Sequence, residues 1–206
     1  MNINDCDLNE DFFHFTNRRN VESILEKGLI ATCGTASQMI NDRPNVSVSY
    51  TFRGVAGILN SFIYTFATKT SPATLPEEFR EYFKEVTDYS STEPLGYEAA
   101  CLGVARKLKD EVYIRVDLTQ EDVDAARIGG GFTGFDINLP YSIPPEKVDV
   151  VTDEEGTPIS AYDFAKIIYE GTKDKEAIRY FHGDFFRMFE MCEGKDIFED
   201  NNKEET

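Results

Sequence analysis

The chain contains few residues of the types that usually carry catalysis or bind metal. Its two histidines, His14 and His182, lie far apart in the sequence. A metal site needs two or more ligands in register, so His182 is interpreted as structural. The four cysteines have no CxxC spacing, and we expect them to be reduced residues of the core; they stand at positions 6, 33, 101 and 192.

The common nucleotide and nucleophile motifs are missing as well. The glycine-rich run 129–134 lacks the Lys-Ser/Thr of a phosphate-binding P-loop, and GxGxxG does not occur in a strand-loop-helix setting. We interpret this run as a loop preceding a strand. No GxSxG sequence is present, so a Ser-His-Asp hydrolase is not supported.

The remaining candidate is His14, in the segment Phe13-His14-Phe15-Thr16-Asn17. A lone His beside aromatic residues is more often a hydrogen-bonded core residue than a ligand. Here it is followed by a helical segment that ends Ile-Leu-Glu-Lys-Gly-Leu at 24–29. This combination resembles the opening of the ADP-ribosyltransferase superfamily, in its DNA-targeting toxin and poly-ADP-ribose polymerase-like branches. The resemblance implies that His14 holds a ribose hydroxyl of NAD and that Thr16 also binds NAD.

The next two candidates follow from the same resemblance. In the family a strand carrying Tyr or Ser leads into a helix, and residues 47–50 (Ser-Val-Ser-Tyr) lead into an apolar helical pattern at 53–67. Tyr50 would stack on nicotinamide, and Arg53 or Arg18 would pair with the pyrophosphate. The alternatives are an ordinary amphipathic strand pair and a surface Arg at a helix start.

The third element of the family is a Glu at the start of a late strand, before an Ile-Pro-Pro-Glu turn. Here residues 143–146 read Ile-Pro-Pro-Glu, but the preceding strand carries Asp136 where the family has Glu. Asp is one methylene shorter, which displaces the carboxylate by about 1 Å, enough to affect catalysis. Asp136 is the predicted catalytic acid, and Glu146 and Glu98 are the alternatives.

The chemistry implied by the resemblance requires these residue types. Cleavage of the nicotinamide–ribose bond passes through an oxocarbenium-like state, as in glycoside hydrolysis. A carboxylate stabilises the growing positive charge, an aromatic ring fixes the nicotinamide, and a His ring nitrogen gives a directional bond to a ribose hydroxyl.

Hydropathy patterns predict the elements that must position these residues. The period of two and the turn residues predict five strands, and the period of 3.6 with capping residues predicts helices, the first ending at Gly28 as its C-cap. The predicted strands are 12–16, 46–51, 111–118, 135–139 and 148–152; the predicted helices are 17–28, 53–67, 76–86, 97–108, 119–126 and the region after 161.

These elements predict an α+β fold. The resemblance makes it an ADP-ribosyltransferase-like core with a split, mostly antiparallel sheet, flanking helices and a helical C-terminal portion. The length of the chain, 206 residues, fits one domain. Within it we expect a catalytic-like core at 11–152, C-terminal helices at 160–192 and a mobile acidic tail at 193–206.

Composition limits the function further. The net charge is −17, which disfavours general nucleic-acid binding. The first ten residues are polar and acidic, unlike a signal peptide, and no apolar run is long enough to span a membrane. We therefore expect a cytoplasmic protein, or one exported without a cleaved signal.

The hypothesis is an NAD-dependent mono-ADP-ribosyltransferase, with NAD as substrate and a protein as acceptor of ADP-ribose. One alternative is a catalytically inactive relative that binds NAD or ADP-ribose. The other is an acidic protein-interaction module, for which the negative charge would be the functional feature.

Overall fold

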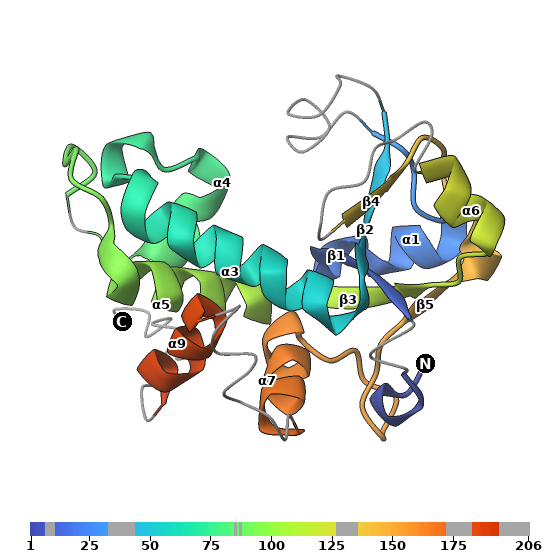
Figure 1. The fold of residues 1–206 in the computed structure, drawn as a ribbon. Coiled ribbons are helices and arrows are strands. Elements are labelled where there is room, and N and C mark those ends of the chain that lie inside the picture. The colour runs from blue at the N-terminus through green and yellow to red at the C-terminus, as the bar shows by residue number, and fades with distance from the viewer. Residues whose placement is uncertain are drawn as a thin grey trace, which may run out of the picture. The chain divides into compact units, whose positions relative to one another are not determined.

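The computed structural model describes residues 1–6, 11–32, 44–84, 86, 88–126, 136–171 and 183–193 (Figure 1). Within these ranges, the side chains of residues 50–55, 58, 78 and 136 are left out of the description. The described chain contains both helices and an antiparallel sheet, which confirms the α+β class.

The chain divides into two compact units. Unit 1 comprises residues 1–58 and 110–165, and unit 2 comprises residues 59–109 and 166–206. The division falls within two helices, α3 (Thr51–Lys69) and α7 (Ala161–Gly171). It does not test whether the chain folds as one domain, so that expectation stays a prediction.

Unit 1 is built on a five-stranded antiparallel sheet of order β4-β2-β1-β3-β5. All five predicted strands are present, with ends that differ by a few residues. The strands are β1 (Phe12–Asn17), β2 (Val46–Tyr50), β3 (Glu111–Val116), β4 (Asp136–Leu139) and β5 (Val148–Val150).

The two faces of this sheet bury different residues, because successive strand residues point to opposite sides. One face packs aliphatic side chains against α1 (Val21–Lys27) and α6 (Gln120–Ala125). On the other face, the rings of Phe13 and Tyr113 pack against Phe164 of α7, with centroids 5.3 and 4.7 Å from it. Phe and Tyr thus supply the large core rings in a chain without Trp.

The predicted helix at 17–28 begins as a 3₁₀ turn, η2 (Arg18–Asn20), before α1. Asn17 caps η2 by accepting a hydrogen bond from the Arg19 amide. Gly28 ends α1 with φ +79°, a conformation that favours glycine. Beyond it, Leu29 pairs with Ile143 across an isolated bridge, which joins α1 to the loop after β4.

Short elements complete unit 1. They are the 3₁₀ turns η1 (Ile3–Asp5) and η6 (Pro145–Lys147) and the turn at 153–157, in which the Asp153 amide donates to the Thr157 carbonyl. This hydrogen bond closes a tight turn between β5 and α7.

Unit 2 is helical in its described residues. It contains the later part of α3, α4 (Glu77–Arg80), α5 (Gly96–Lys109), α9 (Gly183–Cys192) and the 3₁₀ turns η3 (Pro72–Thr74) and η4 (Glu81–Phe83). The single helix predicted at 76–86 is therefore two short turns, α4 and η4. Phe185 and Phe189 are buried on one side of α9. None of the described helices is long and apolar enough to cross a bilayer.

Candidate functional site

The sheet of unit 1 is weakly joined between β1 and β2. These strands pair at only two positions, Phe12 with Tyr50 and Phe13 with Ser49. In contrast, β1 pairs with β3 at six positions and β2 pairs with β4 at four. The described sheet therefore consists of two ribbons, β4–β2 and β1–β3–β5, which are no longer paired with each other beyond Phe13.

His14 is the first residue of β1 beyond this junction. Its Nδ1 lies 2.9 Å from the carbonyl oxygen of Ser47 on β2. A carbonyl only accepts hydrogen bonds, so Nδ1 carries the proton and donates it. In the neutral ring, Nε2 is then an acceptor. The side chain is partly exposed, and Nε2 has no hydrogen-bond partner among the described residues.

The surroundings of His14 favour the neutral ring. Burial lowers its pKa below the usual 6.5, and the hydrogen bond to the Ser47 carbonyl opposes this with a smaller effect. At neutral pH the imidazole is therefore uncharged and presents Nε2 as an acceptor of fixed direction. Such a group suits a ligand hydroxyl better than an anion.

Thr16 lies two residues further along β1 and is 9% exposed. Its Oγ1 accepts a hydrogen bond of 3.1 Å from Nδ2 of Asn20. This bond links the end of β1 to the start of α1 and holds the Thr16 hydroxyl in place. The hydroxyl proton has no acceptor in the described part of the chain.

The backbones of the other predicted residues lie close to this junction. Tyr50 ends β2 opposite Phe12, and Arg53 lies in the first turn of α3, immediately after β2. Asp136 begins β4 opposite Ser49, which itself pairs with Phe13. Neighbouring strands are 4.7–4.9 Å apart, so the backbones of Asp136 and β1 are separated by about 10 Å.

Strand parity distinguishes these backbone positions. Tyr50 lies opposite Phe12, so its position is on the same face of the sheet as His14. Asp136 lies opposite Ser49, which pairs with Phe13, so its position is on the other face. The structure therefore places β1, β2 and β4 next to each other in one sheet, with the positions of His14 and Asp136 on opposite faces of it. Because the side chains of Tyr50, Arg53 and Asp136 lie outside the described part, their convergence on one ligand stays a prediction.

The alternative acids are placed differently. Glu146 is exposed in η6, in the connection between β4 and β5. Glu98 is exposed in the first turn of α5, in unit 2. Arg18, the alternative partner for pyrophosphate, is exposed in η2 directly after β1. The glycine-rich run 129–134, Cys33, His182 and residues 194–206 lie outside the described residues.

The cysteines of the described part are all free thiols. Cys101 and Cys192 are buried, as expected of core residues, and Cys6 is only partly buried. Burial, followed by the charge of Asp11, raises the pKa of the Cys6 thiol to about 11. The Cys6 thiol therefore lacks the lowered pKa of a reactive thiolate.

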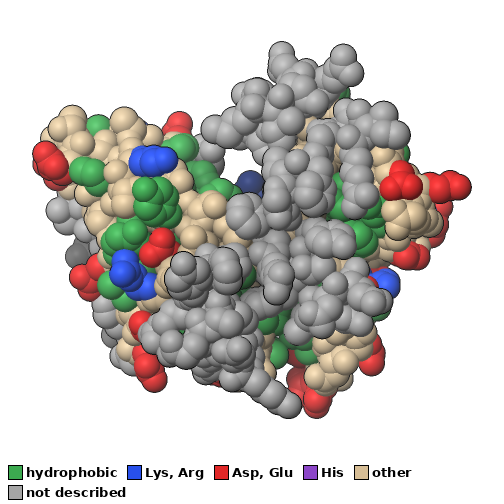
Figure 2. Space-filling view, in the orientation of Figure 1, with side chains coloured by type: hydrophobic (Ala, Val, Ile, Leu, Met, Phe, Trp, Pro, Cys, Tyr) green, Lys and Arg blue, Asp and Glu red, His purple; other side chains and the backbone are tan. Residues whose placement is uncertain are grey.

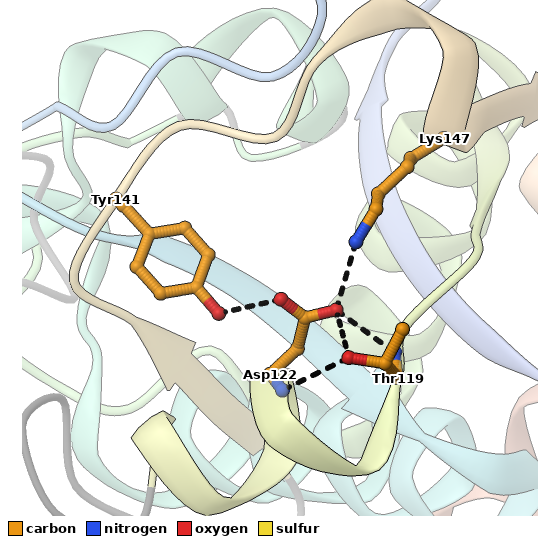
Figure 3. Close-up of polar contacts among 4 residues, drawn as sticks. All are labelled: Thr119, Asp122, Tyr141 and Lys147. Atoms are coloured by element: carbon orange, nitrogen blue, oxygen red, sulfur yellow. Dashed lines mark hydrogen bonds and ion pairs between the residues drawn. The ribbon is translucent and has the colours of Figure 1, made fainter.

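A second polar cluster, which the sequence did not indicate, is centred on Asp122 in α6 (Figure 3). Its carboxylate accepts hydrogen bonds from the Thr119 amide (2.8 Å), the Thr119 hydroxyl (2.9 Å), the Tyr141 hydroxyl (2.8 Å) and the Lys147 ammonium (2.9 Å). Thr119 was expected to start this helix, and Asp122 completes a capping box with it. The two partners from the β4–β5 connection could not be inferred from sequence spacing.

Charge and hydrogen bonding keep Asp122 ionised. Partial burial raises the pKa of this carboxyl, but the hydrogen bonds from Thr119, Lys147 and Tyr141 outweigh burial and hold the pKa well below its usual range. Burial and the neighbouring carboxylate raise the pKa of Tyr141 to about 12. Every acceptor of the carboxylate is engaged within the protein, so we interpret this cluster as structural.

Comparison with known proteins identifies no relative. No protein-family model matches the chain, and neither a curated protein nor a solved structure is significantly similar to it. Any function must therefore be argued from the residues of the site.

Proposed function

We propose that the chain is an NAD-dependent mono-ADP-ribosyltransferase that transfers ADP-ribose to a protein acceptor. The observation that carries the proposal is the fixed imidazole of His14 at the point where β1 and β2 cease to pair. A neutral ring with Nδ1 bound to a main-chain carbonyl offers Nε2 to a hydroxyl, as recognition of a ribose requires.

The donor and acceptor groups of the described residues fit a ribose. His14 Nε2 accepts from one ribose hydroxyl, and the Thr16 hydroxyl, held by Asn20, donates to an oxygen of the same sugar. Both residues lie on the same side of β1, because they are two positions apart. In this proposal Tyr50 stacks on the nicotinamide ring, Arg53 pairs with the pyrophosphate, and the Asp136 carboxylate stabilises the oxocarbenium-like state.

The two-ribbon sheet supports the finer fold assignment. An ADP-ribosyltransferase-like core has a split sheet, and β4–β2 and β1–β3–β5 share only two residue pairs. All five described strands nevertheless belong to one sheet. The division into two separate sheets is therefore part of the proposal.

The charge of unit 1 favours a protein acceptor over DNA. Unit 1 contains 20 Asp and Glu but eight Lys and Arg. Among the coloured side chains of the view in Figure 2, acidic ones appear in more places than basic ones. A surface of this charge repels a phosphate backbone and is compatible with a basic or neutral protein surface.

A second candidate is favoured by one residue. Asp136 stands where the resembling family has Glu, and the shorter side chain displaces the carboxylate by about 1 Å. A relative that binds NAD or ADP-ribose without cleaving NAD would have the same His14 geometry. Binding and nicotinamide release must therefore be measured separately.

The test uses the full-length chain with NAD labelled in the adenylate moiety, alone and with a cell lysate. We expect NAD binding, nicotinamide release, and labelled protein in the lysate. Asp136→Ala should retain binding but lose release, and Asp136→Glu should release nicotinamide faster than the wild type. Asp149→Ala is the matched control, since Asp149 is exposed on β5, at the other edge of the sheet.

The outcomes separate the candidates. Binding without release by the wild type would favour the inactive relative. Absence of NAD binding would exclude both and leave an acidic interaction module as the remaining hypothesis. Normal release by Asp136→Ala would show that Asp136 is not the acid.

A further inference from the structure

The β4–β2 ribbon has one aliphatic face and one polar face. Its aliphatic side chains are all at most 3% exposed and belong to the core against α1 and α6; they are Val46, Val48, Ile137 and Leu139. The alternate positions carry Ser47, Ser49 and Asn138. Ser49 and Asn138 are 5% and 0% exposed, so polar side chains occupy buried positions on this second face.

Asn138 is the most unusual member of this polar face. Its Oδ1 accepts a hydrogen bond of 2.5 Å from the Ser47 hydroxyl on the paired strand. Its Nδ2 is buried and has no hydrogen-bond partner among the described residues. A buried amide without a partner costs free energy, and such groups in folded proteins call for an explanation by a ligand, a water or a functional role.

The location of Asn138 points to a ligand. Ser47 uses its hydroxyl to bind Asn138 and its carbonyl to bind His14, so one residue links the two side chains. Both Ser47 and His14 retain partial exposure. Asn138 is therefore linked through Ser47 to the junction of β1 and β2, and it lies two residues from Asp136 on the same strand and on the same face of the sheet.

We propose that Asn138 is a ligand-binding residue that recognises the carboxamide of the nicotinamide ring. This inference rests on the proposed function, because it assigns a partner within the same site. Nδ2 donates to the carboxamide oxygen and thereby gains the hydrogen bond that it lacks. Asp136 would act at the nicotinamide–ribose bond. Asn138, two residues away on β4, is therefore suitably placed for the nicotinamide ring and its carboxamide.

A carboxamide also suits either orientation of the Asn138 side chain. When the amide is turned over, Nδ2 donates to Ser47 and Oδ1 is the group that needs a partner. A primary carboxamide carries both a donor and an acceptor, so it satisfies Asn138 in both cases. The ribose hydroxyls and the adenine edge of NAD also carry a donor and an acceptor, but ADP-ribose has them too, so a comparison of the two ligands isolates the carboxamide.

The test compares two ligands that differ by nicotinamide. A carbocyclic NAD analogue, which cannot lose nicotinamide, and ADP-ribose are titrated calorimetrically into the full-length wild type and Asn138→Val. We expect the variant to bind the NAD analogue about 5- to 10-fold more weakly, the effect of one lost hydrogen bond, and ADP-ribose within about 2-fold of the wild type.

Stability provides the second readout. Valine has no polar group to leave unsatisfied, so Asn138→Val should retain most of the wild-type melting temperature. Should the lone Ser47 hydroxyl prevent folding, the double variant Ser47→Ala/Asn138→Val removes both partners, which is often nearly neutral. Thr152→Val is the matched control, since Thr152 follows β5, beyond the other edge of the sheet, and binds the Met1 carbonyl.

The outcomes distinguish this inference from the proposed function. Wild-type protein that binds neither ligand refutes the proposed function, and this inference with it. Wild-type protein that binds both, with a variant that loses both equally or loses neither, refutes the role of Asn138 alone. Selective loss of the NAD analogue, absent in Thr152→Val, supports it.

Discussion

Replacing Asp122 by alanine should destabilise unit 1 strongly. The carboxylate joins the start of α6 to the connection between β4 and β5, through Tyr141 and Lys147 (Figure 3). The side chain of Asp122 is only 15% exposed, whereas its partner Tyr141 is 36% exposed and can bond to water once the carboxylate is removed. Alanine leaves the Thr119 amide and the Tyr141 hydroxyl without this acceptor.

The magnitude can be worked out contact by contact. Loss of the capping box with Thr119 costs about 1 kcal/mol. Loss of the hydrogen bond from Tyr141 to an ionised acceptor costs about 1.5 kcal/mol. The Lys147 side chain is 33% exposed, so its ion pair contributes only about 0.5 kcal/mol. We expect Asp122→Ala to lose about 3 kcal/mol, or about 6–12 °C in melting temperature for a chain of this size.

Three conservative variants separate these contributions. Asp122→Asn keeps an acceptor for the Thr119 amide and should lose about half as much as alanine. Tyr141→Phe should lose about 1–1.5 kcal/mol and Lys147→Met about 0.5 kcal/mol. Urea unfolding followed by circular dichroism measures the global effect, and amide hydrogen exchange of residues 119–126 measures the local one.

The pH dependence gives an independent check. The folded-state pKa of Asp122 is depressed, so its contribution is present above the unfolded value, about 3.9, and is lost as the pH falls through the folded value. Wild type and Asp122→Ala should therefore converge in stability only in strong acid. A melting temperature of Asp122→Ala within about 2 °C of the wild type at pH 7 would refute this reasoning.

Three further predictions concern single residues. Gly28→Ala should cost at least about 3 kcal/mol, measured by thermal unfolding, because φ is +79° and a Cβ would overlap the main-chain oxygen of Ile143. Gly103→Ala in α5 should cost about 1–3 kcal/mol by the same measurement, because a Cβ would overlap the ring of Phe83 in unit 2. Wild-type stability should also decline as the pH falls below about 6.5, because the folded-state pKa of His14 is lowered and the unfolded chain then binds the extra proton.

Each of these predictions has a control. Glycines 156 and 171 have open space at the Cβ position, so alanine at 171 should cost little, whereas alanine at 156 should show the cost of a φ of +84° alone. For the pH effect, His14→Gln should remove the part of the slope between pH 5 and 6.5 that is due to His14. Histidine NMR titration of the wild type should show a pKa below 6.5 for the resonance that is lost in His14→Gln. A value at or above 6.5 would contradict the burial argument.

The α+β class and the order of the elements could be predicted from local patterns. Alternation in 46–51 and 111–118 and the helical period in 53–67 and 97–108 give strands and helices that match β2, β3, α3 and α5 to within a few residues. Gly28 and Thr119 were recognisable as helix boundaries, because caps depend on residue types within one turn.

The candidate site was only partly predictable. His14 and Thr16 could be selected from sequence, but the bond of Nδ1 to the Ser47 carbonyl depends on how far β1 and β2 pair. The alternation of Ser47 and Ser49 with valines signalled a polar face on β2. Nothing in sequence spacing showed that Asn138 would lie against it, 91 residues away.

By itself, then, the sequence determined which segments are strands and helices, where α1 ends and where α6 begins. It also determined a net charge that disfavours DNA binding. These properties depend on neighbours within a few residues and on composition. Strand order, the short β1–β2 ladder, the proton position on His14 and the unpartnered amide of Asn138 were decided only by the tertiary structure. They arise from contacts between residues far apart in the chain, and the free energy of those contacts is absent from any local pattern.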